Sequence, residues 1–354
     1  MEKKAVALLA NDLHASKENI EEFNKNWKEL LEVAGKYKVE RILIGGDLFT
    51  SRSSQTLSVL MAVHDFLQYV EGENFSILLA NGNHDKVDQK ANFGYCDIFI
   101  GMPQVNVVDG YRMACFGKIC VTMIDYFPEN DGFLDVLREA ERYVQRGYSD
   151  RDHYLYIHEG IIGGLSSPSE TDLPSNVFDS IWKRIFVGHY HNRRKIAGTN
   201  IEYIGASRQH NYGEDDMKGY TILFSDGSTE FVQNQVNTRY VTVEATYDQI
   251  MSDDFRACLE GASKENTRVK VKVSCDPSQV STVNREELAD LGVAKVEFMT
   301  DSANIKEADQ QSLVERFDKS GLIDSYKNYC ADNKVDNVDL GVSYLNKINA
   351  YVGS

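Results

Sequence analysis

The sequence predicts an α/β fold in which two layers of β-sheet are flanked by helices, followed by a small α/β unit and a helical tail. Over residues 5–80, short apolar runs that end in polar loops alternate with segments of helical periodicity. The middle of the chain is richer in short strands, separated by turns such as Ser225-Asp226-Gly227. Near Asn234–Thr238 the pattern begins again, which indicates a second unit.

The first part of the chain alternates between strand and helix. Buried strands are predicted at Ala5–Ala10, Arg41–Ile44 and Phe75–Ala80. Ser16 is a typical N-cap for the first helix, whose apolar residues recur at helical spacing until Gly35 ends the run. A second helix is predicted at Thr56–Val70. Strands that alternate with helices in this order form a sheet with the helices packed on it.

The remaining elements extend this pattern. Further strands of the large domain are predicted at Ile119–Ile124, Tyr154–Ile157, Ile185–Val187, Ile201–Ile204, Tyr220–Phe224 and Thr229–Val232, with a helix at Gly132–Gln145. The small unit is predicted to have strands at Tyr240–Ala245, Arg268–Ser274 and Val293–Phe298 and helices at Asp248–Leu259 and Arg285–Leu291. Short amphipathic stretches after a polar linker predict a helical tail. The expected domains are residues 1–236, 237–300 and 301–354.

The composition is that of a globular protein with a strong negative charge. The 354 residues are 42% hydrophobic, and the formal net charge is −16. Such a charge argues against a protein that coats nucleic acid by bulk electrostatics, although it allows an enzyme whose positive charge is local. The sequence has no run of about 18 apolar residues and no secretory leader, so we expect a cytoplasmic protein with no membrane association. The six scattered cysteines form no CxxC pair, which predicts reduced thiols.

Five loops that follow predicted strands carry residues that commonly bind metals. These residues are Asp12 and His14, Asp47, the run Asn83-His84-Asp85, His158, and His189 with His191. In an open α/β sheet the carboxyl ends of the strands face one crevice, so the five loops are expected to meet in one pocket. Two other histidines lie elsewhere: His64 is expected in the core or an interface, and His153 in solvent.

The ligand chemistry of these loops favours two metal ions. Leaving His84 and Asp85 aside, the set contains two aspartates, one asparagine and four histidines. Mixed oxygen and imidazole ligands suit Mn²⁺, Fe²⁺ or Zn²⁺ better than Ca²⁺ or thiolate-bound metals. Seven ligands are too many for one ion but enough for two ions that share a carboxylate. Two ions about 3.5–4 Å apart are a common device for phosphoester hydrolysis.

The order of these motifs resembles that of the calcineurin-like metallophosphoesterase superfamily. Within it, the segment Tyr203–Ser207, followed by Tyr212–Glu214 and Lys218–Tyr220, resembles the SbcD-type DNA repair exonucleases, including bacteriophage recombination nuclease subunits and the Mre-eleven nuclease. The resemblance covers residues 5–235, whereas the small unit matches only in pattern and the tail only in position. It implies a two-layered β-sandwich core, a capping domain, and two divalent ions, with Mn²⁺ preferred and Fe²⁺, Mg²⁺ or Zn²⁺ as alternatives.

The resemblance also implies roles for single residues. The first ion would be held by Asp12, His14, Asp47 and His191, and the second by Asp47, Asn83, His158 and His189. His84 would be the general acid for the leaving oxygen, and Asp85 would orient its ring. Local positive charge for the DNA backbone would come from Arg52, Arg193, Arg194 and Arg208. Thr50 stands where the family often has His or Asp, which favours endonuclease over processive exonuclease action.

The function that these features predict is a two-metal DNA nuclease in double-strand-break repair and recombination. The resemblance implies an SbcC-like ATPase of the SMC type as partner, bound through the tail, which agrees with the absence of a GxxxxGK[ST] loop for ATP in this sequence. Helices at Thr56–Val70 and near Phe93–Ile100 predict a homodimer. Two alternatives stay open: a phosphodiesterase for cyclic nucleotides or other small esters, and a metal-binding scaffold that does not cut.

Overall fold

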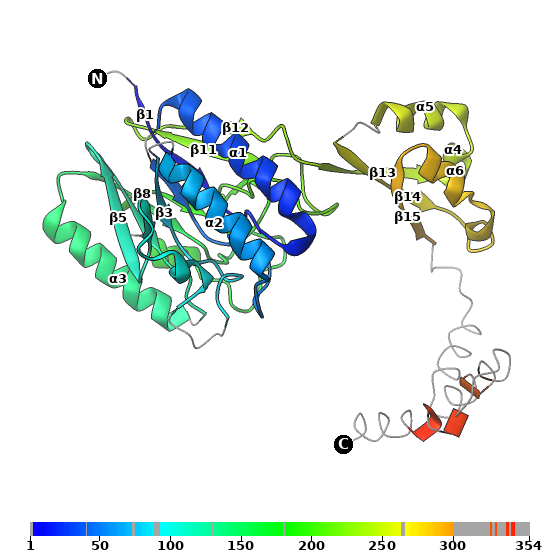
Figure 1. The fold of residues 1–354 in the computed structure, drawn as a ribbon, viewed down its shortest axis with the longest axis horizontal. Helices are drawn as coiled ribbons and strands as arrows, with labels where there is room; N and C mark the ends of the chain where they lie inside the picture. Colours follow the sequence, from blue (N-terminus) through cyan, green and yellow to red (C-terminus); the bar gives the residue numbers. More distant parts are fainter. Residues whose placement is uncertain are drawn as a thin grey trace. The chain divides into compact units, whose positions relative to one another are not determined.

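The architecture is taken from a computed structural model that describes most of the chain. The described residues are 3–39, 41–72, 75–87, 93–128, 130–179, 181–262 and 266–300, with 326–327, 330, 338–339 and 341–343. Figure 1 shows the arrangement of the elements. The predicted tail helices lie almost wholly outside the described residues. No helix in the described part of the chain is long and apolar enough to cross a bilayer.

The large sandwich consists of two six-stranded sheets. The first has the order β12-β11-β1-β2-β3-β4. Its parallel strands are β1 (Ala5–Ala10), β2 (Arg41–Ile44), β3 (Ser76–Leu79) and β4 (Val105–Val107). The antiparallel strands β11 (Gly219–Phe224) and β12 (Thr229–Gln233) lie beside β1. The second has the order β5-β6-β7-β8-β10-β9. Its strands are β5 (Tyr111–Phe116), β6 (Ile119–Ile124), β7 (Asp152–Ile157), β8 (Trp182–Val187), β9 (Arg194–Lys195) and β10 (Ile201–Tyr203).

Three apolar clusters hold helix, sheet, sheet and helix together as four layers. The helices α1 (Ile20–Tyr37) and α2 (Leu57–Gly72) bury residues such as Phe23 and Phe66 against the outer face of the first sheet. The helix α3 (Asn130–Gly147) buries Phe133 against the second sheet. Between the sheets, alternate residues of both meet, including Leu43 and Phe186. The predicted two-layered sheet core with flanking helices is confirmed.

A third sheet has the order β13-β14-β15. It consists of β13 (Arg239–Thr246), β14 (Thr267–Ser274) and β15 (Val293–Met299), and the same region contains α4 (Tyr247–Ile250), α5 (Asp253–Ala262) and α6 (Arg285–Asp290). By its internal contacts the chain divides into two compact units, one of residues 1–243, 253–271 and 286–296 and the other of the remaining segments. The predicted domain limits at 236 and 300 stay a prediction.

Several elements differ from the sequence prediction. The helix α1 continues through Gly35 to Tyr37 and is capped by Lys38, whose φ of 58° is left-handed. A glycine inside a helix costs only about 1 kcal/mol, which the burial of Leu30 and Ala34 on the same helix outweighs. The predicted helix at Phe93–Ile100 is a 3₁₀ helix of five residues, Tyr95–Phe99. The strands β4, β5 and β9 were not predicted, because they are short or alternate weakly in hydrophobicity.

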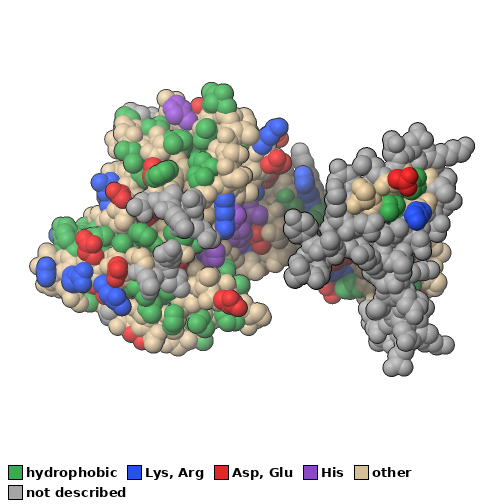
Figure 2. Space-filling model, turned by 90° about the horizontal axis from the view of Figure 1, so that it is seen from below, with side chains coloured by type: hydrophobic (Ala, Val, Ile, Leu, Met, Phe, Trp, Pro, Cys, Tyr) green, Lys and Arg blue, Asp and Glu red, His purple; other side chains and the backbone are tan. Residues whose placement is uncertain are grey.

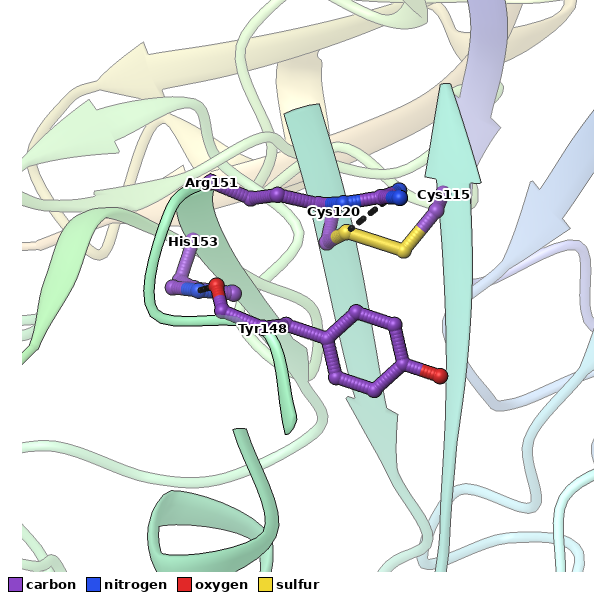
Figure 3. The surroundings of a disulfide bond; sticks show 5 residues. All are labelled: Cys115, Cys120, Tyr148, Arg151 and His153. Carbon is purple, nitrogen blue, oxygen red and sulfur yellow. Dashed lines mark hydrogen bonds between the residues drawn. A yellow bond between two sulfur atoms is a disulfide. The ribbon is translucent and has the colours of Figure 1, made fainter. Parts of the chain in front are cut away.

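The cysteine prediction is wrong for one pair. Cys115 and Cys120 form a disulfide between β5 and β6 (Figure 3). The two strands pair antiparallel with Cys115 directly opposite Cys120, and the Cα atoms lie 4.1 Å apart. A turn at Gly117-Lys118 therefore brings together two thiols that are five residues apart. Cys96, Cys258, Cys275 and Cys330 are free thiols.

The two histidines outside the motif loops also differ from expectation. His153 is buried rather than solvated, and its Nε2 lies 2.8 Å from the carbonyl oxygen of Tyr148 (Figure 3). The side chain of His64 is 48% exposed on α2, so it is not a core residue, and its place in an interface stays a prediction.

Candidate metal centre

The five motif loops meet at one edge of the sandwich, where the parallel strands end. Asp12, Asp47 and Asn83 follow β1, β2 and β3 of the first sheet, whereas His158 and His189 follow β7 and β8 of the second. Each strand is buried and packed in its sheet. The first residues of the loop that follows it therefore have fixed positions at the edge of the sheet. On the face drawn in Figure 2, histidine side chains gather in one hollow of the large sandwich.

The backbone of these loops is strained where the predicted ligands lie. Six described residues other than glycine have a positive φ, and four of them are Asp12, His14, Asp47 and His189. A left-handed backbone is costly for residues with a Cβ and tends to persist at functional sites. At Gly46, with φ of 105°, a Cβ would lie 2.6 Å from Nδ1 of His158. A glycine directly before Asp47 is therefore needed for the two loops to approach.

One group of donors surrounds the side chain of Asp12. Its Oδ1 is buried, has no hydrogen-bond partner, and lies 3.8 Å from Nε2 of His158 and of His191 and 3.9 Å from Nε2 of His14. The Nε2 atoms of His14 and His191 are 3.1 Å apart. Donors bound to one ion at about 2.1 Å lie about 3–4 Å apart, according to the angle between the bonds, so these distances fit a shared cation. An orphaned buried carboxylate oxygen fits the same conclusion.

The second group surrounds Asn83. Its Oδ1 lies 2.9 Å from Nδ1 of His189 and 3.2 Å from Nε2 of His158. Oδ2 of Asp47 lies 3.3 Å from Nε2 of His158 and 3.6 Å from Nε2 of His14, so it faces both groups. This position suits the predicted bridge, although Oδ1 of Asp12 also lies between the same imidazoles. All seven predicted ligands are brought together, and they fit two divalent ions in type and spacing.

The electrostatics of the pocket favour a cation. Burial lowers the pKa of His14 and of His189 to about 4, which leaves both imidazoles neutral and able to bind a metal. At His158 burial would lower the pKa as well, but the carboxylates of Asp47 and Asp12 outweigh it and raise the pKa to about 10. The two carboxylates thus draw positive charge to the point where their oxygens meet the His158 ring.

The imidazoles of the two groups are held by different partners. Nδ1 of His158 lies 2.8 Å from the carbonyl oxygen of Gly45, whereas Nδ1 of His191 lies 2.8 Å from Oε1 of Glu214. Glu214 also accepts from the backbone N–H of His210. A partner at Nδ1 directs Nε2 toward the metal, and a carboxylate makes the ring a stronger ligand than a carbonyl does. The sequence prediction gave Glu214 only as part of a motif, with no role.

His210 is a further residue near the motif loops, to which the sequence prediction gave no role. Its Nε2 lies 2.9 Å from the carbonyl oxygen of Asp12, and its ring packs edge-on against that of His14 at 4.9 Å between centroids. Nitrogens of His14, His191 and His210 lie close enough to hold an ion together. The described contact with the Asp12 carbonyl gives His210 a role in fixing the left-handed backbone there.

His84 lies at the exposed side of the centre. Its backbone N–H donates to Oδ1 of Asp47 at 2.8 Å, and its ring packs against that of His14 at 5.0 Å between centroids. Nδ1 of His84 lies 2.6 Å from the carbonyl oxygen of Thr50, which leaves Nε2 free to face a substrate. The ring is therefore oriented by Thr50 and not, as predicted, by Asp85.

Asp85 has a different position from the predicted one. Its buried carboxylate accepts backbone N–H bonds from Leu48, Phe49 and Gly82, at 3.2, 2.9 and 2.7 Å. Burial, together with the nearby charge of Asp47, raises its pKa to about 7. Asp85 thus joins the loops after β2 and β3 and holds Asp47 and Asn83 in register.

The four predicted DNA-contacting arginines divide into two pairs. Arg208 is buried and donates to the carbonyls of Leu13 and His14, and Arg193 pairs with Glu202 at 3.0 Å beneath the ring of Phe231. Both guanidinium groups are therefore occupied inside the protein. Arg52 and Arg194 are exposed. Arg194 lines a hollow of about 420 Å³ together with His189 and His191.

The chain has only weak similarity to known proteins. No protein-family model matches the chain. The chain is 20% identical over 280 residues to "Putative phosphoesterase 078R" of Invertebrate iridescent virus 3, covering 77% of each protein. Similar solved structures include the nuclease MPE of Pseudomonas putida (15% identity, 55% of this chain and 66% of that chain, TM-score 0.26). Another is the phosphopantetheinyl hydrolase of Mycobacterium tuberculosis (11% identity, 57% and 89%, TM-score 0.36). The fold is defined by the order and pairing of the strands in the two six-stranded sheets.

Proposed function

We propose that this chain is a metal-dependent phosphoesterase and, more closely, a two-metal nuclease that hydrolyses phosphodiester bonds in DNA. The observation that supports it most is the meeting of seven nitrogen and oxygen donors from five loops, with two carboxylate oxygens between the imidazoles. The similarity to a viral phosphoesterase agrees with this chemistry. The residues fit two divalent ions, of which Mn²⁺ suits the ligands best, with Fe²⁺, Mg²⁺ or Zn²⁺ as alternatives.

Two such ions, when bound, supply the Lewis acidity that stabilises the phosphate and activates a water nucleophile. The chain's own residues would hold the two ions and fix their positions. Asp12, His14 and His191 form one side of the site, and Asn83, His158 and His189 the other, with Asp47 facing both. The loops need no rearrangement to reach these positions, because their strands end in a packed sheet edge.

His84 is the residue that completes the reaction. Its Nδ1 donates to the Thr50 carbonyl, so Nε2 is the nitrogen that, in the protonated ring, gives its proton to the leaving oxygen. The ring is half-buried and adjoins the His14 ring, which places it beside the ion site without making it a ligand. Arg194, exposed in the hollow next to His189 and His191, is suited to hold a backbone phosphate. Arg52, also exposed, is a second candidate for such a contact.

The test is Mn²⁺-dependent cleavage of single- and double-stranded DNA, measured beside bis-p-nitrophenyl phosphate and cyclic AMP. We expect turnover of both DNA and the p-nitrophenyl ester, and loss of both on chelation. Turnover of the small esters alone would favour the small-substrate phosphodiesterase. Binding of metal without any hydrolysis would favour the scaffold.

We also propose a homodimer through an apolar surface on α2 and the Tyr95–Phe99 turn. Large hydrophobic side chains are exposed on α2, at Leu57 and Met61, and in or beside the turn, at Phe93, Ile98 and Ile100. Exposed apolar side chains grouped in this way are typical of an interface. Sedimentation of the chain at micromolar concentration tests the proposal, with Leu57→Ser and Ile98→Ser as variants that should give a monomer. A wild-type monomer with and without DNA would contradict it.

An SbcC-like ATPase partner and a role in double-strand-break repair and recombination belong to the same proposal. The tail from about residue 301 is the expected binding region, although it lies almost wholly outside the described residues. Truncation after residue 302 should leave turnover of the p-nitrophenyl ester unchanged and abolish ATPase binding. Aggregation of the truncated protein, or loss of its basal turnover, would show that the tail belongs to the folded core.

A further inference from the structure

The Cys115–Cys120 disulfide lies at the edge of the sandwich that the proposed metal centre does not use. It joins the end of β5 to the start of β6, beside the first residues of β1, β2 and β3. The six cross-strand pairs from Tyr111–Ile124 to Phe116–Ile119 set the register of this hairpin. The hairpin is thus held by its ladder and by its buried face as well as by the disulfide, so the bond can open without loss of the fold.

The two sulfur atoms differ in access. Cys115 lines a cavity of about 610 Å³, whereas Cys120 is fully buried. Thiol–disulfide exchange proceeds by attack of a thiolate on one sulfur while the other leaves. Access therefore selects Cys115 as the sulfur attacked and Cys120 as the sulfur that leaves.

The leaving sulfur has a cationic partner. Nη1 of Arg151 lies 3.8 Å from Sγ of Cys120 (Figure 3). The guanidinium is held above the ring of Tyr148, at 5.5 Å from its centroid. A fixed positive charge beside a sulfur stabilises its thiolate, and a better leaving thiolate accelerates exchange.

The cavity in front of Cys115 is cationic. Apart from Cys115, its ionisable lining residues are Lys4, Lys38 and Arg41, and no carboxylate is among the described lining residues. Arg41 is fixed by a bond from its Nε to Oγ of Ser76 at 3.2 Å and by the ring of Phe116 at 5.7 Å. In a chain of net charge −16, such a group of cations is a local exception that attracts anions.

We propose that Cys115 and Cys120 form a redox site that exchanges with anionic low-molecular-weight thiols recruited by this cavity. The thiolate of the small molecule attacks Sγ of Cys115, forming a mixed disulfide and releasing Cys120 as a thiolate beside Arg151. A second thiol molecule attacks the small-molecule sulfur of the mixed disulfide and releases Cys115. Two small thiols are oxidised to one disulfide, and their two protons pass to the two protein thiols. The site is independent of the proposed metal centre.

The experiment compares two thiols of the same skeleton, anionic 2-mercaptoethanesulfonate and neutral 2-mercaptoethanol. Reduction of Cys115–Cys120 in the full chain is followed by alkylation and peptide mass spectrometry, and rates are expressed per thiolate. We expect the anionic thiol to react roughly tenfold faster at low ionic strength, with the advantage falling as salt is added. Arg41→Gln, with Lys38→Gln as a second variant, should remove most of that advantage.

Matched variants separate the recruitment of anionic thiols by the cavity from the stabilisation of the leaving thiolate by Arg151. Arg112→Gln is the control. Arg112 lies on β5, the strand that carries Cys115, but it bonds Asn106 and does not line the cavity. It should leave the ratio of rates unchanged. Arg151→Gln should slow both thiols by a similar factor, since it acts on the leaving thiolate. Equal rates for the two thiols in the wild type would overturn the cavity's role. Free thiols at 115 and 120 in protein purified without reductant, or a bond that opens only in denaturant, would overturn the redox site.

Discussion

The two edges of the sandwich carry opposite chemistry on the same strands. Where the parallel strands end, carboxylates and buried imidazoles converge, and their backbone is left-handed at four positions. Where the strands begin, Lys4, Lys38 and Arg41 surround a cavity closed on one side by a disulfide hairpin. The difference follows from the topology, because loops after parallel strands converge on one crevice while the opposite edge is built from helix ends and hairpin turns.

The largest expected effect is at the carboxyl edge, from Asp47→Asn. Asp47 faces both donor groups, so the change removes a charge that both ions would share. We expect metal content, read by elemental analysis, and turnover of every phosphoester to fall together to background. Arg41→Gln, at the other edge, is the matched control and should change neither. Metal retained by the Asp47 variant would show that Asp12 is the bridging carboxylate.

His84→Gln should have the next largest effect, and a selective one. The side chain touches the Thr50 carbonyl and the His14 ring but is not placed as a ligand, so the metal content should stay normal. Cleavage of DNA should slow by roughly 10²–10⁴, which is the usual contribution of a general acid. A p-nitrophenolate leaving group needs little protonation, so that substrate should recover much of the rate. Equal losses on both substrates would rule out the role of acid.

Glu214→Gln should have a smaller effect, directed at one ion. The variant keeps a partner for Nδ1 of His191 but removes the carboxylate that strengthens the ring as a ligand. We expect the ion that His191 would hold to lose affinity by roughly 10–100-fold, with turnover restored at high metal concentration. Titration of the metal-free protein with Mn²⁺ gives the two binding constants directly. A uniform loss for both ions, or unfolding, would indicate a structural role instead.

The same comparison shows what the sequence can predict. The sequence predicts the candidate metal ligands because each of them follows a strand closely. The strand pattern therefore indicates where in the fold the side chain lies. These residues are Asp12, His14, Asp47, Asn83 and the later histidines. The partners of these residues were not predicted, since Glu214 reaches His191 across 23 positions and Asp85 bonds backbone amides. Arg193 and Arg208 were taken for surface cations because burial by Phe231, or against the Leu13 carbonyl, leaves no local trace.

The amino edge was missed for a related reason. Cys115 and Cys120 are placed opposite one another by the pairing of β5 with β6, and β5 itself was not predicted. A turn signal at Gly117-Lys118, with strands assigned on both sides, would have placed the two thiols face to face. The cavity residues come from the starts of β1, β2, β3 and β4 and from the ends of β5 and β11, so their proximity depends on the order of strands in both sheets.

The smallest expected effect on activity comes from opening the disulfide. This experiment tests whether the disulfide edge and the metal-centre edge of the sandwich act independently. The double variant Cys115→Ser, Cys120→Ser removes a bond that closes a loop of five positions. The chain-entropy model gives a loss of about 2 kcal/mol in the free energy of unfolding for so short a loop.

Metal content and DNA turnover should change by less than about twofold in this double variant, because changes at distant sites without shared partners act independently. Urea denaturation of the double variant and of the reduced wild type should give the same midpoint, below that of the oxidised protein. If metal affinity instead changes with the state of Cys115–Cys120, the edges are coupled through β1, β2 and β3, and the disulfide acts on the metal centre.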